Sequence, residues 1–162
     1  MRIAVLILAV IGLCGLTATP LIASELGQVV SDTEINGVLG ANAGRDLELS
    51  FGSLQVENSK AGSVNLKTKL NGAALFNAGR NADIAIGGAE LKDAQVGDIN
   101  NTAEINGAII GNAGRDLTFD FGVVRVQNSR VGDITSKTVL NGAILFNAGR
   151  NATVRIGGAD IK

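Results

Sequence analysis

The sequence predicts an all-β fold, namely a β-solenoid made of tandem repeats. Two motifs return every 35 residues without a slip, and apolar residues between them alternate with polar or small ones. Asn-Gly begins at Asn36, Asn71, Asn106 and Asn141, and Asn-Ala-Gly-Arg begins at Asn42, Asn77, Asn112 and Asn147. A period held this strictly indicates stacked, nearly identical units, and a spacing of two indicates strands with one buried face.

Residues 1–24 have the pattern of a secretory signal peptide. Arg2 precedes an apolar run over 3–13, and small residues with Pro20 lead to a cleavage site near Ala23 or Ser24. A membrane anchor is the rival interpretation, but the apolar run is shorter than the ~20 residues that a span requires. Cys14 lies within the leader and is expected to be removed with it. We therefore expect a secreted protein, extracellular or at the cell surface, without a membrane span after cleavage.

The mature chain is expected to form one continuous stack. Residues 25–34 form an N-terminal segment or partial repeat, and 35–162 form four repeats with the bounds 35–69, 70–104, 105–139 and a truncated 140–162. The first and third repeats share Asn-Ala-Gly-Arg-Asp-Leu, whereas the second and fourth share Leu-Phe-Asn-Ala-Gly-Arg-Asn-Ala. A 70-residue duplication of an older 35-residue duplication explains both periods.

Within a repeat, the strands are expected where apolar residues alternate. Leu47, Leu49 and Phe51 mark the first strand, and shorter strands follow at 54–56 and 64–66. Frequent Gly and β-branched residues disfavour helix. Asn-Gly, Asn-Ala-Gly and Gly-Gly separate the strands and suit the corners of a coil.

The number of coils in each repeat has two solutions. A faint half-repeat, offset by 16 to 18 residues, favours two small coils, and the alternative is one large coil. With one coil, the arginines of successive repeats would stack about 4.8 Å apart, at a cost of roughly 3 kcal/mol per pair for an effective dielectric near 20. Two coils place them about 10 Å apart, beyond the ~8 Å screening length. We therefore predict about two coils per repeat.

Twelve Asn and Gly residues at the corners are predicted to shape the stack as turn or ladder residues. The Asn side chains either hold turn conformations, which we favour, or hydrogen-bond to one another along the axis. Gly44 and its equivalents are expected to need positive φ. The twelve are Asn36, Asn71, Asn106, Asn141, Asn42, Asn77, Asn112, Asn147, Gly44, Gly79, Gly114 and Gly149.

The composition argues against most chemistry. After the leader the chain has no Cys, Pro, Trp, Tyr or His, so disulfides, thiolate or imidazole ligands and the common nucleophile and base pairs are missing. We expect no enzyme activity, no catalytic, cofactor-binding or metal-binding residues and no cofactor. Gly87 to Glu90 lacks the dense Gly-x-Gly-x-Asp spacing of calcium-binding β-rolls. A net charge of −1, evenly spread, gives no basis for a nucleic-acid partner.

The last repeat, which stops at Ile161-Lys162, has the motif of the second. A terminal coil that resembles internal coils offers an edge to another molecule, so we expect self-association into filaments. In organisation, 35–162 resembles the curli-type functional amyloids and related secreted β-solenoid fibre subunits of bacteria, although the repeat motif differs from that of curlin. The resemblance implies a structural subunit of an extracellular fibre, in a biofilm or in cell adhesion, and allows a secretion chaperone or nucleator as a partner.

The sequence allows comparison with two other functions. A monomeric solenoid could be a binding module, such as an adhesin that recognises a polysaccharide or a surface, but the sequence offers neither aromatic rows nor regular Thr ladders. A polysaccharide lyase would need acids or bases clustered on one face, and the carboxylates lie singly in turns.

Overall fold

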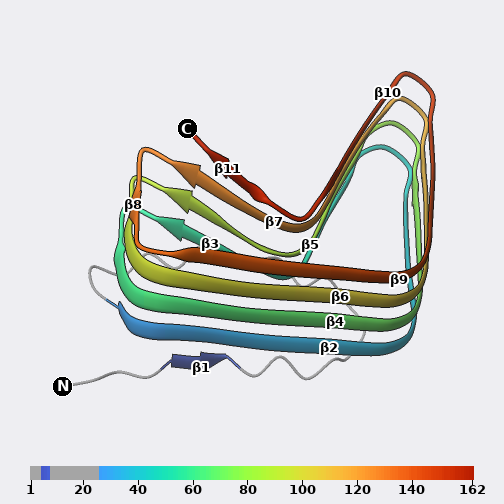
Figure 1. Ribbon diagram of the computed structural model, residues 1–162. Coiled ribbons are helices and arrows are strands. Elements are labelled where there is room, and N and C mark those ends of the chain that lie inside the picture. The colour runs from blue at the N-terminus through green and yellow to red at the C-terminus, as the bar shows by residue number, and fades with distance from the viewer. Residues whose placement is uncertain (1–4, 8–25) are drawn as a thin grey trace.

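The computed structural model describes residues 5–7 and 26–162, which form a β-solenoid of parallel strands (Figure 1). The predicted all-β solenoid is therefore confirmed. One sheet contains β1 (Val5–Ile7), β2 (Leu26–Ala43), β4 (Lys60–Ala78), β6 (Gln95–Ala113), β8 (Arg130–Val131) and β9 (Ile134–Ala148). The other contains β3 (Leu47–Glu57), β5 (Ala82–Lys92), β7 (Asp116–Gln127), β10 (Asn151–Ile156) and β11 (Ala159–Ile161).

Each coil of the solenoid uses one whole repeat. Leu26 pairs with Ala61 and Asn71 with Asn106, and the same offset of 35 holds along both sheets. We call the coils 1 to 4, with the bounds 26–60, 61–95, 96–130 and 131–162. Residues 26–34 thus complete coil 1. The prediction of two coils per repeat is wrong.

The stacked arginines repel one another less strongly than the two-coil prediction requires. The backbone N–H of Arg80 donates to the carbonyl of Arg45 at 2.8 Å, and Arg115 and Arg150 continue the series, so the arginines do stack in successive coils. All four side chains are exposed. In water, with a dielectric near 80, two unit charges 4 Å apart repel by only about 1 kcal/mol. Asp46 and Asp116, which follow two of these arginines, bring opposite charge to the same corner.

Every coil has a bent outline with two arms. In Figure 1, the long strands β2, β4, β6 and β9 run along the base and then turn upward, while β3, β5 and β7 descend and bend toward the other end. The bend within β3, β5 and β7 lies at Gly52, Gly87 and Gly122, which have φ of 59°, 58° and 66°. A backbone in this region strongly favours glycine.

Side chains from the base strands fill the space beneath this bend. Thr68 Oγ1 donates to the carbonyl of Gly52 at 3.2 Å, and Asn101 Nδ2 donates to the carbonyl of Gly122 at 3.0 Å. A Cβ at Gly87 would lie 2.9 Å from Cβ of Thr68. The bend therefore pinches the coil into two compartments.

Two apolar cores occupy these compartments. One contains Leu70, Phe76, Ile105 and Phe119, and the other contains Val64, Leu91, Ile99 and Val126. The half-repeat in the sequence reflects these two arms, because each arm needs its own pair of inward-facing strands. The half-repeat therefore reports that each coil has two arms in cross-section, and it does not report two coils per repeat.

The predicted signal peptide lies outside the described residues except for Val5–Ile7, which form β1. This strand pairs with residues 29–31 of β2. The described residues include no helix that is both long and apolar enough to cross a membrane.

Candidate functional site

The Asn-Gly residues form a column of side-chain hydrogen bonds along the solenoid. Asn71 Nδ2 donates to Asn36 Oδ1 at 2.7 Å, Asn106 to Asn71 at 2.9 Å and Asn141 to Asn106 at 2.8 Å. The second Asn column behaves in the same way, with distances of 3.0, 3.0 and 3.2 Å from Asn42 to Asn147. These asparagines join coil to coil, the role we had not favoured from the sequence.

Both ladders have a direction. In every pair, the amide nitrogen of the later coil donates to the amide oxygen of the earlier coil. At the C-terminal end, Asn141 and Asn147 thus keep an oxygen that accepts no hydrogen bond from another asparagine in the described chain. At the N-terminal end, Asn42 keeps an amide that donates to none. The two ends are complementary to each other.

The expected positive φ at Gly44, Gly79, Gly114 and Gly149 is wrong, since none of them has such a φ. Glycine is required for another reason. A Cβ at Gly79, Gly114 or Gly149 would overlap with the carbonyl oxygen of the equivalent glycine in the preceding coil. At Gly44 the same Cβ would meet nothing within 4 Å. The close approach of two backbones, and not the turn conformation, excludes a side chain.

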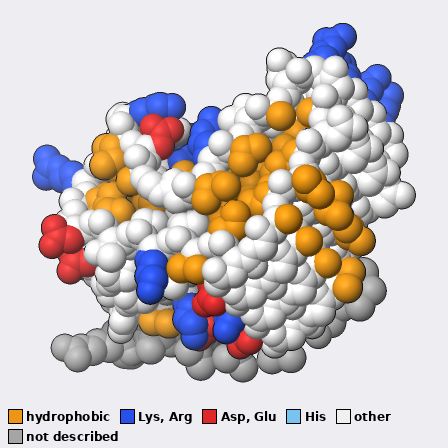
Figure 2. Space-filling model, turned by 45° about the vertical axis from the view of Figure 1, so that its right-hand side comes forward, with side chains coloured by type: hydrophobic (Ala, Val, Ile, Leu, Met, Phe, Trp, Pro, Cys, Tyr) orange, Lys and Arg blue, Asp and Glu red, His pale blue; other side chains and the backbone are white. Residues whose placement is uncertain are grey.

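The last coil exposes side chains that are buried in the coils before it. Ile86 and Phe121 are 2% and 0% exposed, whereas Ile156, in the same column, is 47% exposed. Leu70 and Ile105 are fully buried, and Leu140 is 36% exposed. Figure 2 shows hydrophobic side chains gathered on this side of the molecule, below the Lys and Arg side chains at its upper edge. The end of the stack is thus an apolar surface with unpaired strands around it.

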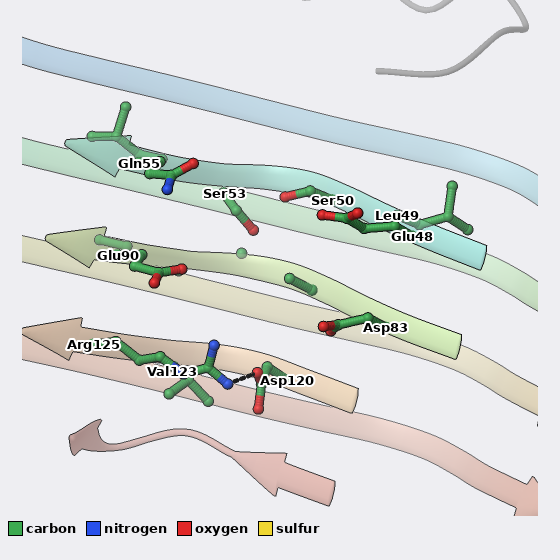
Figure 3. Close-up of a pocket in the computed structure, with 15 residues that line it drawn as sticks. Glu48, Leu49, Ser50, Ser53, Gln55, Asp83, Glu90, Asp120, Val123 and Arg125 are labelled. Carbon is green, nitrogen blue, oxygen red and sulfur yellow. Dashed lines mark hydrogen bonds and ion pairs between the residues drawn. The ribbon is translucent and has the colours of Figure 1, made fainter. Parts of the chain in front are cut away.

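A second candidate is the hollow on the outer face of β3, β5 and β7, of about 320 Å³. Figure 3 shows Asp120 and Arg125 facing each other there. Asp120 is almost buried and also pairs with Arg155 at 3.2 Å, across to the next coil. Sequence reasoning missed this cluster because its members are 5 and 35 residues apart and only the coil register brings them together.

Asp83 lies beside this cluster and has a perturbed acidity. Partial burial, with the Asp120 carboxylate as the second cause, raises the pKa of Asp83 above its usual 3.8, and Arg125 opposes the shift. In the described part of the chain, no three His, Cys, Asp or Glu residues are arranged to hold a metal ion. The hollow therefore offers charge and hydrogen bonds, with the carboxylates of Asp83 and Glu90 as acceptors and the guanidinium of Arg125 as a cationic donor.

Comparison with protein-family models, curated proteins and solved structures finds no match to this chain. The resemblance to curli-type fibre subunits stays a prediction.

Proposed function

We propose that this chain is the structural subunit of a secreted extracellular fibre, of the kind found in biofilms or on cell surfaces, and that it assembles by stacking end to end. The exposed apolar end of coil 4 carries the proposal. Ile156, Leu140 and Ile161 are 47%, 36% and 67% exposed there. Moving a side chain of this size from full exposure to full burial is worth about 1.5–3 kcal/mol, and these three are already partly buried, so covering each would contribute roughly 1 kcal/mol toward binding a second coil.

The two Asn ladders add a polar reason for the same contact. The oxygens of Asn141 and Asn147 could accept from Asn36 and Asn42 of another copy, with the donor direction of the internal pairs. Neighbouring strands would continue the backbone pairing in parallel. An unpaired edge of this length is an established template for adding strands.

Access to the N-terminal edge depends on the predicted leader. β1 pairs with residues 29–31 of β2, so the edge is partly covered in the full chain. Removal of residues 1–24 would open it. The members of both apolar cores lie at Val29 or later, so the chain from Glu25 retains them all.

The test uses protein beginning at Glu25, concentrated at physiological salt and followed by sedimentation and negative-stain electron microscopy. We expect unbranched filaments with a meridional reflection near 4.8 Å. A protein that stays monomeric at millimolar concentration would contradict the proposal.

A matched pair of variants makes this test specific for end-to-end stacking. Gly44→Ala adds a Cβ that meets nothing in the single chain but would overlap the carbonyl of Gly149 in a copy stacked below. Gly40→Ala also meets nothing, and its column carries the outward side chains of Leu75 and Ile110. Gly44→Ala should abolish filaments, and Gly40→Ala should leave them unchanged.

A monomeric binding module is the second candidate, and the hollow on β3, β5 and β7 favours it. Its mixed acids and arginine suit a polar, uncharged or zwitterionic ligand such as a polysaccharide. Binding of a glycan by soluble monomer, lost in Arg125→Ala, together with the absence of filaments, would favour this function over the first.

A further inference from the structure

In the core that contains Phe76 and Phe119, the apolar side chains on the two facing walls alternate between large and small from coil to coil. On the wall of β2, β4, β6 and β9, one inward column reads Ala41, Phe76, Gly111, Phe146. On the opposite wall, a column reads Leu47, Ala82, Leu117, Ala152. Coils 1 and 3 thus carry their bulk on the second wall, and coils 2 and 4 carry a Phe on the first. We call these coil types A and B.

This alternation is a packing requirement. A Cβ at Gly111 would lie 2.5 Å from Cδ1 of Phe146, so the Phe of a B coil occupies space above the small residue of an A coil. The rings of Phe146 and Phe119 are 4.7 Å apart between centroids. Interiors are close-packed, so two like coils in contact would leave a void on one wall and crowding on the other. Each coil therefore accepts only the opposite type as its neighbour.

We infer that the partner at the apolar end of coil 4 is coil 1 of a second copy, stacked head to tail without a register shift. The inference rests on the proposed function and adds the identity, polarity and register of the junction. The described chain reads A-B-A-B, so B meets A at this junction, as it does between coils 2 and 3. Phe146 would lie beneath Ala41 of the next copy, as Phe76 lies beneath Gly111 within the chain.

Charges at the two ends agree with this register and not with a shifted one. Lys137 and Lys162 of coil 4 would lie beside Asp32 and Glu57 of the next copy. Inside the chain the same columns already pair Lys67 with Asp32 at 3.5 Å and Lys92 with Glu57 at 3.2 Å. Asn151 would lie beside Asp46 of the next copy, the same two residue types that bond between Asn81 and Asp46 at 2.8 Å in the chain, with the Asn now in the earlier coil. A tail-to-tail contact would instead pair the edge strands of coil 4 in antiparallel orientation, whereas every strand pair of the described chain is parallel.

The test adds whole coils to the chain from Glu25, so that types A and B still alternate at every internal contact. Appending residues 128–130 and then 96–127 after Lys162 gives five coils ending in type A. Appending a further 128–162 gives six coils ending in type B, and this variant is the matched control. Both should fold at least as stably as the parent, as measured by circular dichroism and thermal melting, because neighbouring repeats stabilise one another.

The six-coil protein should polymerise as the parent does, with the axial subunit repeat lengthened from about 19 Å to about 29 Å. In a filament of the five-coil protein, a type A coil must stack on another type A coil, without the Phe that fills the core. Its critical concentration for assembly should therefore be at least ~100-fold higher than that of the parent. Five-coil filaments at the parental concentration would overturn the inference and leave the proposed function standing. If the parent itself forms no filaments, the proposed function fails first.

Discussion

Glycines that look identical in the repeat carry different constraints in the structure. Gly44 and Gly114 both stand in Asn-Ala-Gly-Arg, and neither has a positive φ. They differ in what lies below, since a Cβ at Gly114 would overlap the carbonyl oxygen of Gly79 and one at Gly44 meets nothing. The constraint is a property of the interface between coils, so a residue's place in the stack decides it.

Replacing these two glycines by alanine should separate their roles in the soluble chain. Gly114→Ala forces the stacked corners of two neighbouring coils apart and should lower the free energy of unfolding by at least about 2 kcal/mol. Gly44→Ala should leave it within about 0.5 kcal/mol of the parent. Urea unfolding of the dilute, unassembled protein measures both. Equal losses in the two variants would show that the local turn, and not the approach of the coils, requires glycine.

At the scale of the element, the bend in β3, β5 and β7 shapes both the core and the outer hollow. Its glycines turn the strand inward against Thr68, and the opposite face gathers Asp83, Asp120 and Arg125. Asp120 is stabilised by two arginines, whereas Asp83 keeps a raised pKa because partial burial and the Asp120 carboxylate disfavour its charged form.

The raised pKa of Asp83 predicts a pH dependence of stability. The folded state binds this proton more tightly than the unfolded state, so its contribution is fully present below the unfolded pKa and is lost as the pH rises through the folded pKa. Asp83→Asn should remove that dependence and stabilise the protein at pH 7 by ~0.5 kcal/mol or less, since the group is partly exposed.

Asp93→Asn is the control for this measurement, because its neighbours in register are already Asn58 and Asn128 and its side chain is exposed. Thermal melts between pH 3 and pH 8 measure both variants. An unchanged profile for Asp83→Asn would contradict the assignment.

At the scale of the whole molecule, stability should decline toward the ends of the stack. Coils 2 and 3 are covered on both sides, whereas, among the strands that the structure describes, β10 and β11 pair only with β7. In a parallel sheet, an edge strand leaves about half of its amides without a partner strand. Coil 4 is therefore less protected than coils 2 and 3, and it is also the surface at which the chain would assemble.

Hydrogen exchange followed by mass spectrometry should reveal this gradient. In dilute monomer, amides of β10 and β11 should exchange fastest and those of β5 and β6 slowest. In filaments, protection of β10 and β11 should rise to that of internal strands, with β5 as the internal reference. Unchanged exchange at β10 and β11 in assembled material would place the contact elsewhere on the molecule.

The sequence by itself determined the all-β solenoid and its 35-residue period, because in-register stacking forces each column to hold residues that tolerate a copy above and below. It also located the Asn columns at Asn36 and Asn42 and the strand at Leu47 to Phe51. Only the tertiary structure decided that one repeat makes one coil, since two arms joined by a bend and two separate small coils leave the same half-repeat. It alone decided the reason for glycine at Gly114 and the meeting of Asp120 with Arg155, because both depend on neighbours that are 35 residues distant in the chain.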